Sequence, residues 1–87
     1  MKIRDGYLLR SVAGKNIVVS VGAQLDFNGM LTLNDTGVFF WNLLSKGVTK
    51  EEMLDALLKE YDVSAEDASK DIDEFIGKLK DARLLED

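Results

Sequence analysis

The stretch MLTLNDTGVFFWNLLSKGVTKEE, residues 30–52, contains the change from strand to helix that decides the fold of this chain. Residues 30–33 form a short, mostly apolar run, which fits a strand. Asn34 is a preferred N-cap residue, and Leu33 and Val38 occupy the two positions of a hydrophobic staple around it. A helix is therefore predicted to begin directly after the strand.

Two further helices are predicted downstream of this first one. Gly47 suits the position just beyond the first helix, and Thr49 and Glu52 match a capping box that starts the second. Ser64 is the expected start of the third helix. The apolar residues of that helix recur at the three- and four-residue spacing of one buried stripe: Ala68, Ile72, Phe75, Leu79 and Ala82.

Strand and turn signals dominate the chain before residue 30. Two runs rich in apolar and β-branched residues, 7–12 and 17–21, are joined by residues 13–16, which indicate a hairpin turn. Residues 22–29 include glycine, aspartate and asparagine, which are typical of turns. Strands grouped before helices predict an α+β fold, a three-stranded antiparallel sheet followed by three helices, similar to a winged helix-turn-helix.

Length and composition bound the class of protein. With 87 residues, no proline, no repeat and no linker, we expect a single domain over residues 1–87. The longest apolar run, residues 38–41, is far too short to cross a bilayer, so no membrane association is expected. No secretory signal is visible and cysteine is absent, which makes a cytoplasmic location the expectation.

The charge of the chain is unevenly spread. Four basic and two acidic side chains give residues 1–33 a net charge of +2, so residues 34–87 carry −7 within the total of −5. Most charged residues in the N-terminal half of the third predicted helix are acidic, although this half would have to enter the groove of DNA in a winged helix. Nucleic acid is therefore not an expected partner.

Catalytic and metal-binding chemistry lacks its usual residues. Histidine and cysteine are absent, and the glycines fit neither a phosphate-binding loop nor a dinucleotide motif, so we predict no enzyme activity, no metal and no cofactor. Asp71 and Glu74 share one helix face while Asp73 points elsewhere, which favours a solvated face over a cation site. The aromatic residues 39–41 are predicted to be mainly core.

Residues 30–33 carry none of the devices that usually protect a sheet edge, because they include no proline, lysine or other charge. At an edge, their free N–H and C=O groups would pair with an added peptide strand, but the pattern fits a short interior strand equally well. The apolar stripe of the third helix is wider on one flank, through Ala65 and Ile76. Such a flank borders either a groove or a broad core.

Several short motifs follow one another in a distinctive order. They are DFNGM (26–30), LNDTG (33–37), WNLL (41–44), YDV (61–63) and DIDEF (71–75). Over nearly the whole chain, from Tyr7 to Leu85, this combination resembles the PqqD family of peptide recognition elements. One departure is Arg83, where the family usually has glycine, so an ordinary glycine cap is not assumed there.

The resemblance implies a winged-helix-like domain without catalytic or DNA-binding activity. Members of that family bind the leader segment of a ribosomally made precursor peptide and deliver it to a modifying enzyme, often a radical S-adenosylmethionine enzyme, as in pyrroloquinoline quinone biosynthesis. The expected partners are therefore a precursor peptide and a modifying enzyme. We expect the protein to be a monomer or a weak homodimer.

The resemblance also implies that the leader adds to the third predicted strand and lies against the third helix. The helix positions are inferred from the wider flank of its apolar stripe. The expected peptide-binding residues are Gly29, Met30, Leu31, Thr32, Leu33, Ile72, Asp73, Ile76 and Lys80. The alternative is a degenerate winged helix that serves DNA binding or dimerisation.

Overall fold

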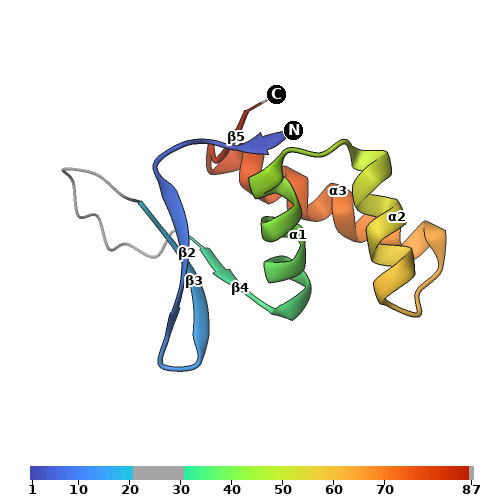
Figure 1. Cartoon of the computed structure of the whole chain (residues 1–87), viewed down its shortest axis with the longest axis horizontal. Coiled ribbons are helices and arrows are strands. Elements are labelled where there is room, and N and C mark those ends of the chain that lie inside the picture. Colours follow the sequence, from blue (N-terminus) through green and yellow to red (C-terminus); the bar gives the residue numbers. More distant parts are fainter. Residues whose placement is uncertain (21–30, 87) are drawn as a thin grey trace.

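The computed structural model describes residues 1–20 and 31–86 (Figure 1). The elements follow one another as β1 (Lys2–Ile3), β2 (Tyr7–Val12), β3 (Lys15–Ser20), β4 (Leu31–Leu33), α1 (Asp35–Lys46), α2 (Lys50–Glu60), α3 (Ala65–Asp81) and β5 (Leu85–Glu86). Strands β2, β3 and β4 form an antiparallel sheet that precedes the three helices. The predicted α+β class is confirmed.

The hairpin of β2 and β3 turns more tightly than the sequence suggested. Val12 pairs with Lys15, so only Ala13 and Gly14 form the turn, and the second strand begins at Lys15 rather than at Ile17. Ala13 has a φ of 51° and Gly14 a φ of 78°. Two successive positive φ angles are what a type I′ turn requires, and this turn matches the twist of the two strands.

Strand β4 lies at one edge of the three-stranded sheet, whose order is β2-β3-β4. It pairs with β3 alone within residues 1–20 and 31–86. The edge position that the sequence left open is thereby decided for residues 31–33. The expected turn at residues 22–29 and the expected binding residues Gly29 and Met30 lie outside the described residues.

Each helix begins at the residue that its sequence predicts. The Gly37 N–H donates to the Asn34 side chain over 2.8 Å at the start of α1. Thr49 and Glu52 form the complete capping box of α2, with hydrogen bonds of 2.9 and 3.1 Å. Ser64 caps α3. These caps satisfy N–H groups that the first turn of a helix leaves without partners.

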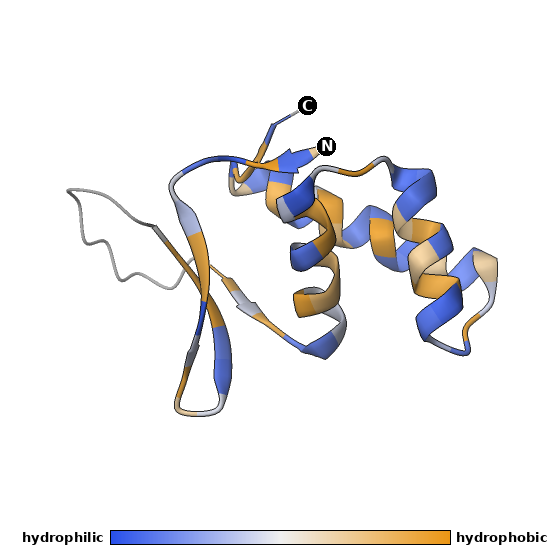
Figure 2. Cartoon of the chain, viewed as in Figure 1, coloured by the Kyte–Doolittle hydropathy of each residue, from blue (hydrophilic) through white to orange (hydrophobic). Residues whose placement is uncertain are grey.

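The core lies where the three helices meet the inner face of the sheet. The buried residues of α3 belong to one cluster with those of α1 and α2, and Figure 2 shows hydrophobic residues on α3 where it passes these two helices. The aromatic residues 39–41 contribute Phe40 and Trp41 to the core, and the Phe40 ring lies 5.2 Å from that of Phe75. The largest fully buried side chains come from all three helices, from β3 and from the segment after α3: Val18, Leu44, Met53, Ile72, Leu79 and Leu84.

A second, two-stranded sheet joins the two ends of the described chain. Lys2 pairs with Glu86 and Ile3 with Leu85, and the Arg4 N–H donates to the Leu84 carbonyl over 2.8 Å. This pairing was not predicted, because strands of two residues are too short to show a period in the sequence. It anchors the segment before β2 against the end of α3 (Figure 1).

Helix α3 ends in a Schellman motif that lacks the usual glycine. The Leu84 N–H donates to the Leu79 carbonyl over 2.8 Å, and the Arg83 N–H donates to the Lys80 carbonyl over 3.0 Å. This geometry places Arg83 at a φ of 59°, in the left-handed region that glycine adopts most easily. Arg83 therefore adopts a left-handed backbone conformation, and its side chain makes this conformation strained.

We expect Arg83→Gly to raise the free energy of unfolding by about 1 kcal/mol, because it removes the left-handed strain at this cap. Urea denaturation measures the change. Lys70→Gly, on the exposed face within α3, is the control and should lower stability by about 1 kcal/mol. A loss of stability in both variants would contradict the strain at Arg83.

Candidate functional site

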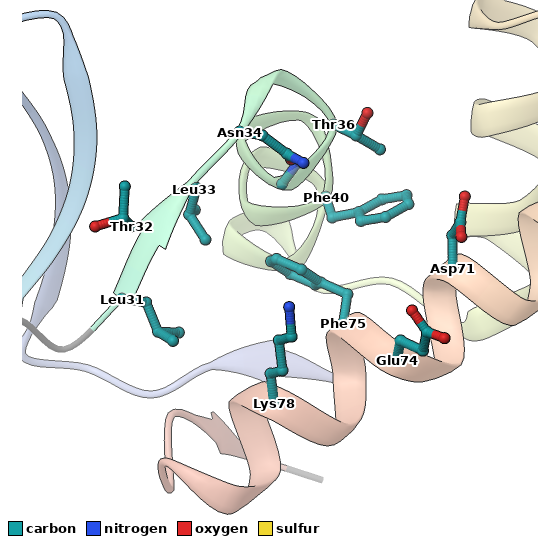
Figure 3. A pocket seen from close by; sticks show the side chains of 11 residues that line it. Leu31, Thr32, Leu33, Asn34, Thr36, Phe40, Asp71, Glu74, Phe75 and Lys78 are labelled. Carbon is teal, nitrogen blue, oxygen red and sulfur yellow. The ribbon is translucent and has the colours of Figure 1, made fainter.

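A groove of about 610 Å³ lies between β4, the start of α1 and one face of α3 (Figure 3). The open edge of the sheet forms one side and α3 forms the other. Its lining residues are Leu31, Thr32, Leu33, Asn34, Thr36, Gly37, Phe40, Asp71, Glu74, Phe75 and Lys78. The groove therefore joins free backbone groups of a strand to charged and aromatic side chains of a helix.

The tight hairpin turn fixes which backbone groups of β3 face each neighbour. In a two-residue turn, the Lys15 N–H is directed at the Val12 carbonyl. Backbone groups alternate in direction along a strand, so those of Asn16 and Val18 point the other way, towards β4.

The register between β3 and β4 extends this alternation to the open edge. Asn16 lies opposite Leu33, and Val18 lies opposite Leu31, so both leucines direct their backbone groups at β3. Thr32 stands between them and must direct its N–H and C=O outward. We infer that Thr32 supplies the backbone donor and acceptor of the edge within β4.

The side chains of β4 separate between the two faces of the sheet. Leu33 is buried and Leu31 is half-buried on the face towards the helices, whereas Thr32 is exposed. Figure 3 shows both leucines directed towards α3 and Thr32 directed away from it. Any strand added beside β4 would therefore place alternate side chains in the groove and on the outer face of the sheet.

The floor of the groove is aromatic and lies close to the core. Phe40 of α1 and Phe75 of α3 meet there, and only 2% and 9% of their surfaces are exposed. Gly37 packs against β4 so closely that an added Cβ would lie 3.1 Å from the Leu33 Cβ. A glycine at this position therefore lets the first turn of α1 approach the last residue of the strand.

One face of α3 supplies the helical wall of the groove. Asp71, Glu74, Phe75 and Lys78 follow the i, i+3, i+4, i+7 spacing of a single helix face. The three charged side chains are exposed. The structure thus confirms that Asp71 and Glu74 share a face, and it places a lysine and a phenylalanine on that face with them.

Some of the predicted binding residues that the structure describes line the groove, and the others lie in the core or elsewhere on the surface. Leu31, Thr32 and Leu33 line the groove. The four predicted positions on α3 are all described, and none of them lines the groove. Ile72 and Ile76 are buried in the core, Lys80 is exposed outside the groove, and the Asp73 carboxylate lies 2.7 Å from the Lys50 ammonium of α2.

The extra width of the α3 stripe has a structural explanation. Ile76 extends the core face, which is the second of the two readings that the pattern allowed, and Asp73 faces α2 instead of β4. The groove lies on the opposite flank. Its signal was present in the spacing of Asp71, Glu74, Phe75 and Lys78, but nothing in the sequence indicated which flank faces the sheet.

In the described parts of the chain, no helix is long and apolar enough to cross a membrane. Within the same residues, no three acidic side chains gather in a way that could hold a metal ion. The lining of the groove offers a backbone edge, an aromatic floor and a charged rim.

These features define a winged-helix-like α+β domain with an open sheet edge beside a groove. The family model described as coenzyme PQQ synthesis protein D (PqqD) matches residues 17–85, and the chain belongs to this family. The chain is also similar to the solved structure described as TbiB1 in complex with the TbiA(beta) leader peptide. That similarity covers 99% of this chain and 95% of the other, with a TM-score of 0.78 and 27% identity. A comparison with curated proteins found no match.

The close approach at Gly37 predicts a contrast between two glycines. Gly77→Ala in α3 should raise the free energy of unfolding by about 1 kcal/mol, because a Cβ there meets nothing within 4 Å and alanine favours the helix. Gly37→Ala should instead lower it by about 1 kcal/mol, because the new Cβ crowds Leu33. Chemical denaturation of both variants measures the difference, and equal gains would contradict tight packing at the junction.

Proposed function

We propose that this protein binds the leader segment of a ribosomally made precursor peptide by adding it as a strand beside β4. The observation that carries the proposal is the open edge at Thr32, which lies directly beside a groove. Main-chain hydrogen bonds supply affinity in this mode of binding, and side-chain pockets supply specificity. Membership of the PqqD family and the likeness to a domain described in complex with a leader peptide support the same conclusion.

The peptide occupies the groove with every second side chain in this proposal. Leu31 and Leu33 border those side chains from the sheet, and Phe75 and Lys78 border them from α3. The remaining side chains of the peptide lie with Thr32 on the outer face of the sheet. The aromatic floor favours an apolar side chain at the centre.

We also propose that the protein delivers the bound leader to a modifying enzyme. In this role the protein holds the leader in the cytoplasm and leaves the chemistry to its partner, so it is not itself an enzyme. The support is the family membership together with a groove whose lining offers hydrogen bonds, charges and aromatic rings. Binding through the backbone of the leader suits such a role because it leaves the rest of the precursor free for the enzyme.

The charge of α3 weighs against the DNA-binding alternative. Glu66 and Asp67 are exposed in its first turn, and Asp71, Asp73 and Glu74 are exposed in the turns that follow. A helix with this surface would repel the phosphates that a recognition helix has to approach.

Thr32→Pro tests the proposal, because proline removes the outward N–H at the centre of the edge. We expect peptide affinity to fall by about tenfold or more while the amide spectrum remains that of a folded protein. Thr32→Ala keeps the N–H and is the control, with an affinity close to that of the original protein. A leader titrated into labelled protein, with affinity taken from the amide shifts, gives both values.

Leu31→Pro and Leu33→Pro are expected to behave differently from Thr32→Pro, because each removes an N–H that faces β3. These variants should lose stability as well as binding. Normal affinity in folded Thr32→Pro would refute strand addition at β4.

A further inference from the structure

Charged residues of opposite sign stand at the two ends of the groove. Figure 3 shows Lys78 on the side next to Leu31, Asp71 on the side nearer Phe40 and Thr36, and Glu74 on α3 between these two. The rings of Phe40 and Phe75 lie between them. The groove therefore has an electrostatic direction as well as an apolar centre.

The length of this pattern matches a short extended peptide. Asp71 and Lys78 are seven residues apart on α3, which corresponds to a rise of about 10 Å along the helix. Four residues of a strand span about 13 Å, slightly more than the rise from Asp71 to Lys78, and the flexible Lys78 side chain reaches across the difference. Three successive groove-facing side chains of a bound strand, at alternate positions, would thus meet an acidic, an aromatic and a basic surface.

The direction of the bound strand follows from the sheet. Every described neighbour in the three-stranded sheet is antiparallel, and antiparallel pairing is slightly more stable for each residue than parallel pairing. A peptide antiparallel to β4 begins near Leu33 and ends near Leu31. It therefore passes Asp71 and Glu74 first and Lys78 last (Figure 3).

We propose that the groove selects peptides that carry a basic, an apolar and an acidic side chain, in that order, at alternate positions. The basic side chain faces Asp71 and Glu74, the apolar one lies over the aromatic floor, and the acidic one faces Lys78. This inference rests on the proposed function and adds to it the chemical class and the order of the peptide side chains.

The salt bridge described between α3 and α2 does not involve the charged residues of the groove, which supports a role for those residues in recognition. Asp73, on another face of the helix, is already paired with Lys50 over 2.7 Å. Among the described residues, Asp71, Glu74 and Lys78 take part in no such pair. Their charges therefore remain available to side chains of a peptide that enters the groove.

Capped synthetic peptides of about nine residues test the order directly. The first carries lysine, leucine and glutamate at alternate central positions with threonine between them, and the second carries the same residues in reverse order. We expect the first to bind about fivefold to tenfold more tightly, because the second replaces two attractive ion pairs with repulsive ones. The difference should shrink in about 0.5 M NaCl, which screens exposed charges.

A charge reversal within the groove identifies the residue that reads the last position. With Lys78→Glu, a peptide with lysine at that position should bind more tightly than one with glutamate. Lys70→Glu makes the same change in charge on α3 outside the groove lining, and it should retain the original preference. Loss of the preference in both variants would mean that only net charge matters, which would overturn the inference.

Amide shifts of Leu31, Thr32 and Leu33 distinguish a failure of the selection by charge from a failure of strand addition at β4. Equal affinity for both peptide orders, with these amides shifted, would overturn the selection by charge and leave strand addition intact. If no peptide shifted these amides at millimolar concentration, strand addition at β4 would fail and the selection by charge would fail with it.

Discussion

Asn34 ends the last strand of the sheet and caps the first helix, and the position of the groove depends on this single junction. Its side chain accepts the Gly37 N–H, while Leu33 immediately before it is buried in the core. The strand cannot move relative to α1 without breaking the cap or exposing the leucine. As a result, the open edge of β4 is held at a fixed distance from the aromatic floor that α1 supplies.

Helix α3 uses different faces for stability and for the groove. Ile72 and Leu79 are fully buried, Asp73 reaches α2, and Asp71, Glu74 and Lys78 border the groove. Phe75 belongs to two of these surfaces, because its ring packs against Phe40 in the core and also forms part of the groove floor. A rigid core therefore supports the floor, so a bound peptide would meet a preformed surface.

The two ends of the described chain stabilise α3 from outside the main sheet. Pairing between β1 and β5 holds the segment after the helix, and the Schellman motif at Arg83 turns the chain into that pairing. The Met1 nitrogen and carbonyl also pair with the Val48 backbone between α1 and α2. These contacts fix the helices to each other on the side away from β4.

Local chemistry determined the elements of this fold, because caps, turns and apolar periods act within a few residues. Asn34, Thr49 and Ser64 predicted where the three helices begin, and residues 30–33 predicted an unprotected strand, of which the structure describes Leu31–Leu33. Neither the edge position of β4 nor the flank of α3 that faces it could be read in this way. Both depend on how elements distant in the sequence pack together, and a helix with apolar residues on two flanks fits either orientation. Tertiary packing therefore decided that Asp71, Glu74 and Lys78 line the groove while Ile72, Asp73, Ile76 and Lys80 do not.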